Sequence, residues 1–547
     1  MTWLDGVSLL GGLGLLLFGI RTLGNSLEEA AGSRMKKLLE QLTRNRLMSV
    51  GVGALVTIGM QSSTATTLMV VGFVNAGLLT LSRAAGVIMG ANIGTTVTAL
   101  MLSVKVDFGA IFTALGGLCF LLSHREKAQL IGKIMMGVGM LFLGMQTMTS
   151  AAAPLGEMEG FRNLMLLAQN PLLGVPVGAL MTAVLSSSAA CVGLLQAMRV
   201  SGALPMRAAM FILFGQNIGT CLTALLSSAG ASRTAKRAAL VHLLFNVVGT
   251  ALFVILALVL PLDQWVIALA GEDNLGLQVA VTHILFNGVT TLVLLPACDW
   301  LVKLACLLVP GEDAPKEGLR MQYFDNRFLT NPPVAVEMLF REVGRMSALV
   351  MENYRFSLDF YASPEGKTLS AFEEREELID FLNGEITQAL TDVKGKNLPR
   401  KEALLSGSLF HVVNDLERIG DHATNIVEIG QALEKEQSRF SPTAQEEIRD
   451  LTARVTEMLE RGLAIVENQS TDKGEIARVE ELEEQVDALS ESLADAHVER
   501  VKEKLCTPRN GMLYLDMLNN LERIADHADN LATGVDDGLR AGKAMLW

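Results

Sequence analysis

The stretch Gly90–Ala99, "GANIGTTVTA", recurs 125 positions later as "GQNIGTCLTA", Gly215–Ala224. Both copies lie inside long apolar runs of the kind that cross a membrane, where an unsatisfied polar group costs several kcal/mol. Asparagine and threonine at such a place therefore need a partner or a ligand inside the protein. Because the motif occurs twice, the same requirement applies to two parts of one fold.

The duplication extends far beyond this motif. Shifted by 125 positions, the chain aligns with itself without a gap over residues 12–103, and 20 of the 53 positions in 51–103 are identical to their partners. Shared apolar composition explains scattered leucine and alanine matches, but not the alignment of "QSSTA" at Gln61 with "SSSAA" at Ser186. We therefore expect two structural repeats, at about 12–128 and 137–260.

Charge and hydropathy divide the 547 residues into two parts. Residues 1–309 carry 18 Lys/Arg and 12 Asp/Glu, whereas residues 310–547 carry 27 and 46. Runs of about 20 apolar residues, long enough to cross ~30 Å of hydrocarbon, occur in the first part. The predicted spans are 3–23, 84–103, 108–123, 130–149, 206–228, 238–260 and 277–300. We expect a membrane domain in contact with the lipid bilayer at 1–309, a linker at 310–333 and a water-soluble helical domain at 334–547.

The basic residues predict the orientation of the repeats. Six Lys/Arg lie in 21–46, which should therefore face the cytoplasm, whereas the repeat partner 146–171 carries one arginine and two glutamates. The connection at Lys105–Asp107 is neutral, but its partner carries three basic residues in 233–237. Corresponding loops then lie on opposite faces of the cytoplasmic membrane, which is typical of an inverted-topology repeat. We expect the acidic domain in the cytoplasm, and its charge argues against nucleic acid as a partner.

The inversion requires that residues 47–80 and 172–205 do not cross the membrane. Each segment has polar residues near its middle, so it can fold as a re-entrant hairpin whose arms of about 14 residues reach about 21 Å. The hairpin ends, called here the first tip (Gln61–Thr64) and the second tip (Ser186–Ser188), would then lie near the bilayer midplane from opposite sides. The alternative is two ordinary spans in each segment, with Ser and Thr hydroxyls bonded to their own helices.

A break inside a hairpin can bind ions of either sign. The arm that enters the tip ends in unpaired carbonyl groups, which suit a hard cation, and the arm that leaves it begins with unpaired N–H groups, which suit an anion. Hydroxyl and amide side chains can serve either ion. The repeated core segments contain no Asp or Glu, which favours Na⁺ over H⁺ as the coupling ion. The composition indicates a small oxyanion moving with Na⁺, without distinguishing phosphate, sulfate and carboxylates.

The motifs "QSSTATT", "GANIGTT", "LSSSAA" and "GQNIGT", at this spacing, resemble the type II sodium–phosphate cotransporter family over residues 1–309. The resemblance implies that inorganic phosphate and Na⁺ bind at the hairpin serines and at the paired Asn-x-Gly-Thr segments. Carried onto this chain, the binding residues are Gln61, Ser62, Ser63, Thr64, Asn92, Thr95, Thr96, Ser186, Ser187, Ser188, Asn217 and Thr220. Ser186 departs from the family pattern, which usually repeats the glutamine, so the two tips need not be equivalent.

A second doublet, "HLLFN" at His242 and "HILFN" at His283, lies in two later apolar runs. Histidine and asparagine four residues apart share one face of a helix. Polar residues of this kind are favoured as hydrogen-bonding contacts between the helices of a membrane bundle. A role in the transport pathway is the alternative.

The acidic part of the chain contains its own repeat. "NDLERIGDHATNI" at Asn414 and "NNLERIADHADNL" at Asn519 lie 105 positions apart. The amphipathic pattern over 334–547 predicts about six helices in two three-helix bundles. In each copy a glutamate and an aspartate share one helix face, which suits a hard metal ion. A solvated face, or a packing network that includes His422 and His527, is the alternative.

This doubled Glu-x-x-x-Asp pattern resembles the PhoU family of cytoplasmic regulators of phosphate transport and signalling over residues 334–547. The resemblance implies clusters of divalent or iron ions and contacts with phosphate-signalling proteins. The implied metal ligands are Glu417, Asp421, Glu522 and Asp526. A phosphate regulator joined to an anion carrier is an independent indication of phosphate.

The sequence therefore predicts an all-α, multi-pass membrane protein with inverted repeats and two re-entrant hairpins, followed by a PhoU-like double three-helix bundle. The expected function is Na⁺-coupled transport of inorganic phosphate by alternating access. The alternatives are a membrane-anchored phosphate sensor or scaffold, and a transporter of another small oxyanion. Neither a nucleophile–base pairing nor a Walker-type loop is present in the sequence, so we do not expect an enzyme.

Overall fold

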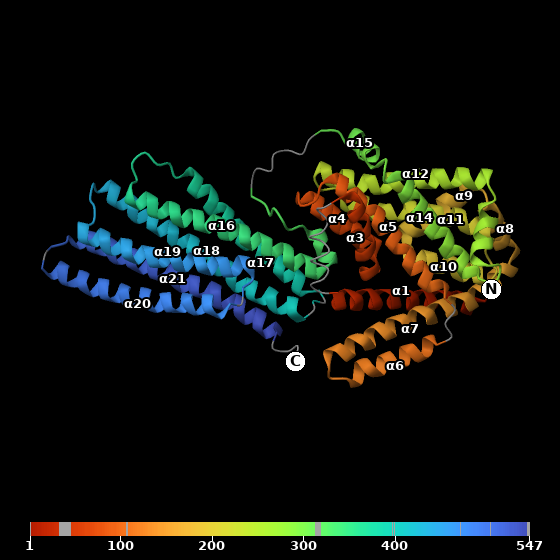
Figure 1. Ribbon diagram of the computed structural model, residues 1–547, viewed down its shortest axis with the longest axis horizontal. Coiled ribbons are helices and arrows are strands. Elements are labelled where there is room, and N and C mark those ends of the chain that lie inside the picture. Colours follow the sequence, from red (N-terminus) through yellow and green to blue (C-terminus); the bar gives the residue numbers. More distant parts are fainter. Residues whose placement is uncertain are drawn as a thin grey trace. The chain divides into compact units, whose positions relative to one another are not determined.

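The computed structural model in Figure 1 describes residues 2–31, 45–104, 108–311, 319–396, 398, 400–470, 472–503 and 505–543. Every regular element within these ranges is a helix, which confirms the predicted all-α class. The chain divides into two compact units, Met1–Pro315 and Lys316–Trp547. Most basic residues of the predicted cytoplasmic loop 21–46, the connection Lys105–Asp107 and part of the linker 310–333 lie outside the described residues.

The first unit contains the duplicated segment and three helices that follow it (Figure 1). The first repeat contains α1 (Trp3–Ala31), α3 (Arg46–Met60), α4 (Ser63–Asn75), α5 (Leu81–Ser103) and α6 (Gly109–Leu122). The second contains α7 (Glu126–Ala152), the 3₁₀ helix η2 (Ala153–Glu157), α8 (Glu159–Leu167), α9 (Pro171–Leu185), α10 (Ser188–Val200), α11 (Met206–Ser227) and α12 (Arg233–Val259). The helices that follow are α13 (Leu262–Ala270), α14 (Leu275–Leu294) and α15 (Cys298–Leu308).

Six helices of the described ranges are long and apolar enough to span a membrane, namely α1, α5, α7, α11, α12 and α14. They coincide with six of the seven predicted spans, so the first unit is a multi-pass membrane domain. The seventh prediction, 108–123, corresponds to α6, a shorter apolar helix of 14 residues. That length gives about 21 Å of helix against a hydrocarbon core of ~30 Å. α6 packs along α7, where a Cβ added at Gly116 would lie 2.7 Å from the carbonyl oxygen of Gly132.

The contact between α1 and α7 establishes how the repeats are related. A Cβ added at Gly12 would lie 3.0 Å from the carbonyl oxygen of Gly144, and one added at Gly19 would lie 2.8 Å from that of Gly137. The two helices are therefore antiparallel. Because Gly137 and Gly144 are the repeat partners of Gly12 and Gly19, exchanging the repeats reproduces the same contact, as a two-fold axis requires. Equivalent spans that run in opposite directions confirm the inverted-topology repeat.

The two hairpins have corresponding limits in both repeats. Gln61 and Ser62 separate α3 from α4, and the bounds of these helices moved by 125 positions are the bounds of α9 and α10. The arms have 15 and 13 residues in each hairpin. At about 22 and 20 Å of helix, no arm crosses the hydrocarbon alone. The arms of each hairpin pack on one another, so each segment is a re-entrant hairpin rather than two ordinary spans.

Glycines allow each hairpin to approach the helix that carries the repeated asparagine. A Cβ added at Gly53 of α3 would overlap the carbonyl oxygen of Val87 in α5. In the second repeat, a Cβ added at Gly178 of α9 would overlap that of Ile212 in α11. Both partners of the second contact lie 125 positions after those of the first. This close backbone approach places each tip beside the helix that carries the repeated asparagine. This helix, α5 in the first repeat and α11 in the second, is called here the motif helix.

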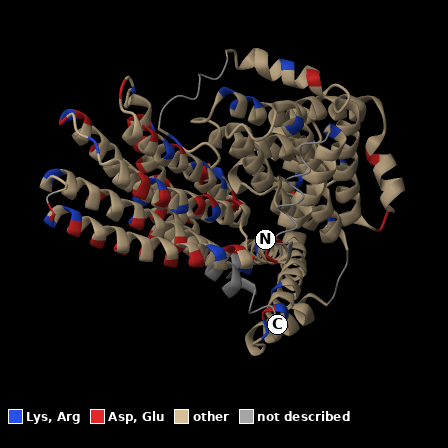
Figure 2. Ribbon diagram, turned by 60° about the vertical axis from the view of Figure 1, so that its left-hand side comes forward, with Lys and Arg blue, Asp and Glu red and all other residues tan. Residues whose placement is uncertain are grey.

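The second unit contains the 3₁₀ helix η3 (Asn326–Thr330), α16 (Pro332–Ala362), α17 (Ser370–Lys394), α18 (Arg400–Lys435), α19 (Pro442–Asn468), α20 (Lys473–Lys502) and α21 (Pro508–Lys543). α16, α17 and α18 pack as one three-helix bundle, α19, α20 and α21 pack as another, and α18 packs along α21. Acidic and basic residues occur all along these helices, whereas they are sparse in the first unit (Figure 2). The predicted double three-helix bundle is confirmed.

Candidate functional site

Each tip begins with one residue in the left-handed region of backbone conformation, and the serine that follows it caps the next helix. Gln61 and Ser186, which end α3 and α9, both have a φ of 51°. Ser62 and Ser187 each accept a hydrogen bond from the backbone amide three residues later, at 3.2 and 3.3 Å. These two predicted binding residues therefore serve first as the N-caps of α4 and α10.

The residues that begin α4 and α10 carry the hydroxyl groups that capping does not use. Ser63 is 4% exposed and Ser188 is partly exposed. Within the described residues, neither side chain makes a hydrogen bond, and nor does that of Thr64. They stand beside the amides of the first helical turn, which have no partner inside the helix. Hydroxyl and amide donors at the positive end of a helix are suited to an oxyanion.

The two tips differ in how the left-handed residue is held. Gln61 is buried, accepts a hydrogen bond from Thr98 at 2.8 Å and donates one to the carbonyl oxygen of Ile58 at 2.7 Å. Ser186 is exposed, and its hydroxyl donates to the carbonyl oxygen of Ala183 at 3.5 Å. The replacement of glutamine by Ser186 therefore makes the second tip more open than the first.

The threonines of the Asn-Ile-Gly-Thr motifs are bonded to their own helices. Thr95, Thr96 and Thr220 donate their hydroxyl hydrogens to backbone carbonyl oxygens at distances of 2.7 to 3.0 Å. Because these donors are used, the lone pairs of the hydroxyls remain, and lone pairs attract a cation rather than an anion. The buried Gln216 Oε1 has no partner in the described part of the chain. Such neutral oxygens fit Na⁺, a hard cation.

Asn92 and Asn217 are equivalent buried residues with different hydrogen bonds. Asn92 Nδ2 has no partner among the described residues. Asn217 Nδ2 donates to the carbonyl oxygen of Leu213 at 2.9 Å, and Asn217 Oδ1 lies 3.3 Å from His283 Nε2. The interhelical hydrogen bond expected of the His283 motif is therefore present, between α11 and α14.

The structure brings the motif helices of both repeats together. α4 packs against α5 and also against α11 and α12, whereas α10 packs against α11 and also against α5 and α14. Gln196 of α10 donates to the carbonyl oxygen of Ala99 in α5 at 2.8 Å. Gln216 of α11 donates to that of Cys191 in α10 at 3.2 Å. The predicted binding residues of both repeats thus lie on helices that share one core.

In the second unit, the predicted ligands Glu417 and Asp421 of α18 face a second acidic pair on α17. A Cβ added at Gly420 would lie 3.2 Å from Glu376 Oε1. Burial, and then the charges of Asp380 and Asp421, raise the pKa of Glu376 to about 7. Burial and the charge of Asp421 likewise raise the pKa of Glu417. The first acidic cluster consists of Glu376, Asp380, Glu417 and Asp421.

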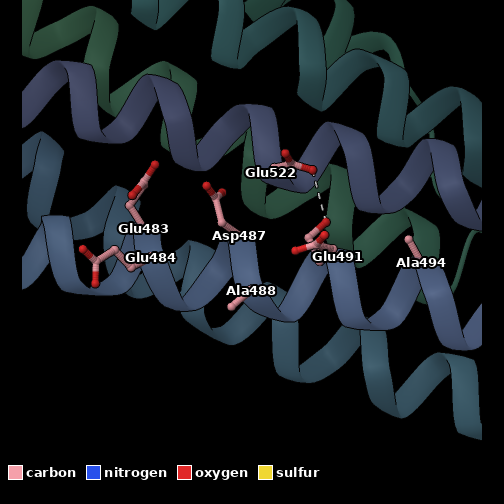
Figure 3. Close-up of a pocket in the computed structure, with 8 residues that line it drawn as sticks. Glu483, Glu484, Asp487, Ala488, Glu491, Ala494 and Glu522 are labelled. Atoms are coloured by element: carbon pink, nitrogen blue, oxygen red, sulfur yellow. Dashed lines mark hydrogen bonds between the residues drawn. The ribbon is translucent and has the colours of Figure 1, made fainter.

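The second bundle has a similar arrangement between α20 and α21, drawn in Figure 3. Carboxylate oxygens of Glu483, Asp487 and Asp526 lie within 4.8 Å of one another. Glu522 accepts a hydrogen bond from Ser490 at 3.2 Å, beside an open pocket of about 610 Å³ that Glu483 and Asp487 also line. Oxygen ligands at this spacing fit a divalent cation. The second acidic cluster consists of Glu483, Asp487, Glu522 and Asp526.

The structure therefore separates the four predicted ligands into two clusters, one in each bundle. The repeated motif indicated only half of each cluster. The missed pairs, Glu376 with Asp380 and Glu483 with Asp487, have the same Glu-x-x-x-Asp spacing as the predicted pairs. Searching the helix before each "LERI" motif for this spacing could have found them.

Between the clusters, α18 and α21 meet at two equivalent histidines. His422 Nδ1 lies 2.8 Å from Asn520 Oδ1, and His527 Nδ1 lies 2.8 Å from Asp415 Oδ1. The two imidazole rings stack with their centroids 5.8 Å apart. The histidines thus belong to the packing network anticipated as an alternative, whereas the carboxylates of the clusters face the neighbouring helices α17 and α20.

The fold and these sites define a class: a multi-pass membrane protein built on an inverted repeat with two re-entrant hairpins, joined to a helical domain with paired acidic clusters. The family model of the Na⁺/Pi-cotransporters matches residues 15–150 and 156–272. That of the PhoU domain matches 343–430 and, 105 positions later, 448–535. The chain therefore belongs to the Na⁺/Pi-cotransporter family and carries PhoU domains.

Proteins of several organisms are similar to this chain. "Uncharacterized protein YqeW" of Bacillus subtilis (strain 168) is 30% identical over 302 residues, which cover 54% of this chain and 97% of that protein. "Putative inorganic phosphate export protein YjbB" of Escherichia coli (strain K12) is 24% identical over 522 residues, 94% of each chain. "Sodium-dependent phosphate transport protein 2A" of Rattus norvegicus is 36% identical over 92 residues, 16% of this chain and 14% of that protein.

Proposed function

We propose that the protein carries inorganic phosphate across the cytoplasmic membrane together with Na⁺, by alternating access. The observation that carries this proposal is the duplicated tip. Two helix starts, one from each repeat, present the unbonded hydroxyls of Ser63 and Ser188 beside unpaired backbone amides. Together they offer hydrogen-bond donors to a tetrahedral oxyanion, and bonds to a charged acceptor are the strong ones.

The choice of Na⁺ rests on the oxygens of the motif helices. Hydroxyl lone pairs of Thr95, Thr96 and Thr220 and the amide oxygen of Asn217 are neutral ligands. The repeated core segments contain no Asp or Glu through which a proton could pass. The name of the Rattus norvegicus relative, which aligns with this chain over 92 residues, specifies sodium dependence.

Alternating access is supported by the symmetry of the packing. α4 and α10 each contact the motif helix of the other repeat, so a movement of one repeat against the other would open the tips to one face and then to the opposite face. The name of the Escherichia coli relative specifies export. The same site can serve either direction, because the gradients of Na⁺ and phosphate determine net flow.

We further propose that residues 334–547 lie in the cytoplasm and regulate this transport, with divalent or iron ions in the two acidic clusters. The PhoU homologues among the relatives are named as accessory proteins of phosphate-specific transport. Such a domain is suited to contacts with phosphate-signalling proteins.

The test is the uptake of radiolabelled phosphate by purified protein in liposomes, under an inward gradient of Na⁺ or, as a control, of K⁺. We expect uptake with Na⁺ that unlabelled phosphate suppresses and sulfate does not. Uptake suppressed by sulfate would indicate another oxyanion as the substrate. Phosphate binding without flux under any gradient would favour the membrane-anchored sensor.

A further inference from the structure

The side-chain hydrogen bonds of the two repeated asparagines, Asn92 and Asn217, differ because of a helix that lies outside the repeats. His283 belongs to α14, which follows the duplicated segment and packs against α5, α10, α11 and α12. Its ring nitrogen Nε2 lies 3.3 Å from Asn217 Oδ1, and both side chains are buried. Among the described residues, Asn92 makes no side-chain hydrogen bond. Because α14 has no counterpart in the other repeat, its contact with Asn217 makes the two Asn-Ile-Gly-Thr motifs unequal.

The hydrogen bonds of Asn217 determine the direction of its amide and the tautomer of His283. Asn217 Nδ2 donates to the carbonyl oxygen of Leu213, so the amide oxygen faces the imidazole. An amide oxygen can only accept, so the hydrogen lies on His283 Nε2. His283 Nδ1 is buried without a partner in the described part of the chain, which matches a ring nitrogen that carries no hydrogen.

A donated hydrogen bond fixes the orientation of the Asn217 side chain and leaves one lone pair of its oxygen unused. We propose that His283 is a positioning residue that holds the Asn217 oxygen toward the coupling cation. Asn92, whose amide hydrogens are unbonded, keeps them for the anion. This division of roles rests on the proposed function, since it assigns the two equivalent asparagines to the two transported ions.

The chain contains a matched control for His283. His242 lies on α12 in the same His-x-x-x-Asn pattern, and it is buried to a similar extent. Both of its ring nitrogens lack a hydrogen-bond partner among the described residues. The neighbouring Asn246 donates to Cys221 Sγ at 3.2 Å rather than to either repeated asparagine. Substitutions at His242 therefore disturb a buried imidazole without releasing Asn217.

The first experiment compares His283→Ala and His283→Gln with the same two substitutions at His242, in liposomes that contain equal amounts of folded protein. Loss of one positioning hydrogen bond should raise the half-saturating Na⁺ concentration by about 2- to 10-fold in His283→Ala. His283→Gln keeps a donor and should stay within about twofold of the unchanged protein. Both His242 variants should leave the half-saturating Na⁺ concentration unchanged. Equal losses in His283→Ala and His283→Gln would contradict the positioning role.

A double-mutant cycle asks whether His283 acts through Asn217. Combined with Asn217→Ala, the His283→Ala change should add nothing to the half-saturating concentrations of phosphate and Na⁺. Combined with Asn92→Ala, its effect should add in full. Additive effects in the Asn217 cycle would overturn the proposal. Should His283→Ala fail to fold, His283→Leu takes its place.

The cycle also separates this inference from the proposed function. If phosphate flux through the unchanged protein proves independent of Na⁺, sodium coupling is wrong. The half-saturating phosphate concentration then still reports whether His283 and Asn217 act as one unit. If the protein binds phosphate without transporting it, the same cycle is carried out on the dissociation constant of phosphate.

Discussion

Gln61 and Ser186 are 125 positions apart in the sequence, and both have a φ of 51° at the break between two helices. Positive φ is uncommon for residues other than glycine, because the Cβ crowds the backbone. A glycine would adopt this conformation without strain, yet neither repeat has one at this position. Because a left-handed residue ends both α3 and α9, the two hairpins break in the same way, which places Ser63 and Ser188 at equivalent helix starts.

The glycine contacts between hairpin and motif helix lead to the first prediction. Gly53→Ala places a methyl group against the carbonyl oxygen of Val87, so we expect a loss of about 1–3 kcal/mol in the free energy of unfolding. Gly51 lies on the same helix with no atom within 4 Å of an added Cβ, so Gly51→Ala should be neutral or slightly stabilising. Thermal unfolding in detergent measures both. Equal melting temperatures for the two variants would contradict this packing of α3 against α5.

Much of this architecture could be predicted from the sequence. The gapless alignment of two segments with Ser-Ser and Asn-Ile-Gly-Thr at equal spacing restricts both to one fold. Arms of about 14 residues are too short to span, so the hairpins at 47–80 and 172–205 followed from length. At 108–123 the predicted apolar segment agrees with α6 to within one residue at each end.

Contacts between distant segments were less readable. Nothing in the sequence indicates that Gln61 meets Thr98 or that His283 meets Asn217, because these pairs depend on which helices become neighbours. The acidic clusters illustrate the same limit. The motif on α18 and α21 stood out through its repetition, whereas its partners on α17 and α20 became significant only when the bundles placed them opposite.

The second prediction concerns the orientation of the first unit. We expect Ala229, between α11 and α12, to face the cytoplasm, and Glu157 and Glu272 to face the outside. All three positions are exposed. Single cysteines at these sites, in a variant without the six native cysteines, can be labelled with a membrane-impermeant reagent in intact cells. Labelling of Glu157→Cys and Glu272→Cys but not of Ala229→Cys is expected. Labelling of all three from one side would contradict the predicted topology.

The third prediction concerns the second acidic cluster. We expect residues 334–547 to fold alone as a water-soluble domain, since their charged helices match bundles in water. Carboxylates within 4.8 Å repel one another, so a bound divalent or iron ion should raise the melting temperature. Asp526→Asn should remove most of this increase. The control is Glu484→Gln, which changes an exposed carboxylate that lines the same pocket but does not belong to the group of three within 4.8 Å, and it should preserve the increase. A melting temperature that none of the added ions changes would contradict a metal site.

The fourth prediction is a pH dependence in the second unit. Burial, and then the charge of Arg500, lower the pKa of His497, whose ring stacks on Tyr514 with centroids 4.4 Å apart. A histidine whose folded pKa lies below its unfolded value near 6.5 stabilises the fold above about pH 6.5. That stability is lost as the pH falls below 6.5 toward the folded pKa. His497→Phe keeps a ring for stacking without a titrating group, so its melting temperature should fall less between pH 7.5 and 5.5. Parallel pH profiles for the two proteins would show that His497 is not responsible.

We expect both tips to bind one phosphate ion, and the equilibrium dissociation constant of phosphate, measured on purified protein in saturating Na⁺, tests this. Ser63→Ala and Ser188→Ala each remove a donor to a charged group, which is worth on the order of 1.5–3 kcal/mol and hence about a 10- to 150-fold loss of affinity. Ser201→Ala, at the other end of α10, removes a hydroxyl that donates to the carbonyl oxygen of Met198 and should leave the constant unchanged. We therefore expect weaker phosphate binding in both tip variants and unchanged binding in the control. Unchanged affinity in Ser63→Ala and Ser188→Ala, with the protein intact, would contradict it.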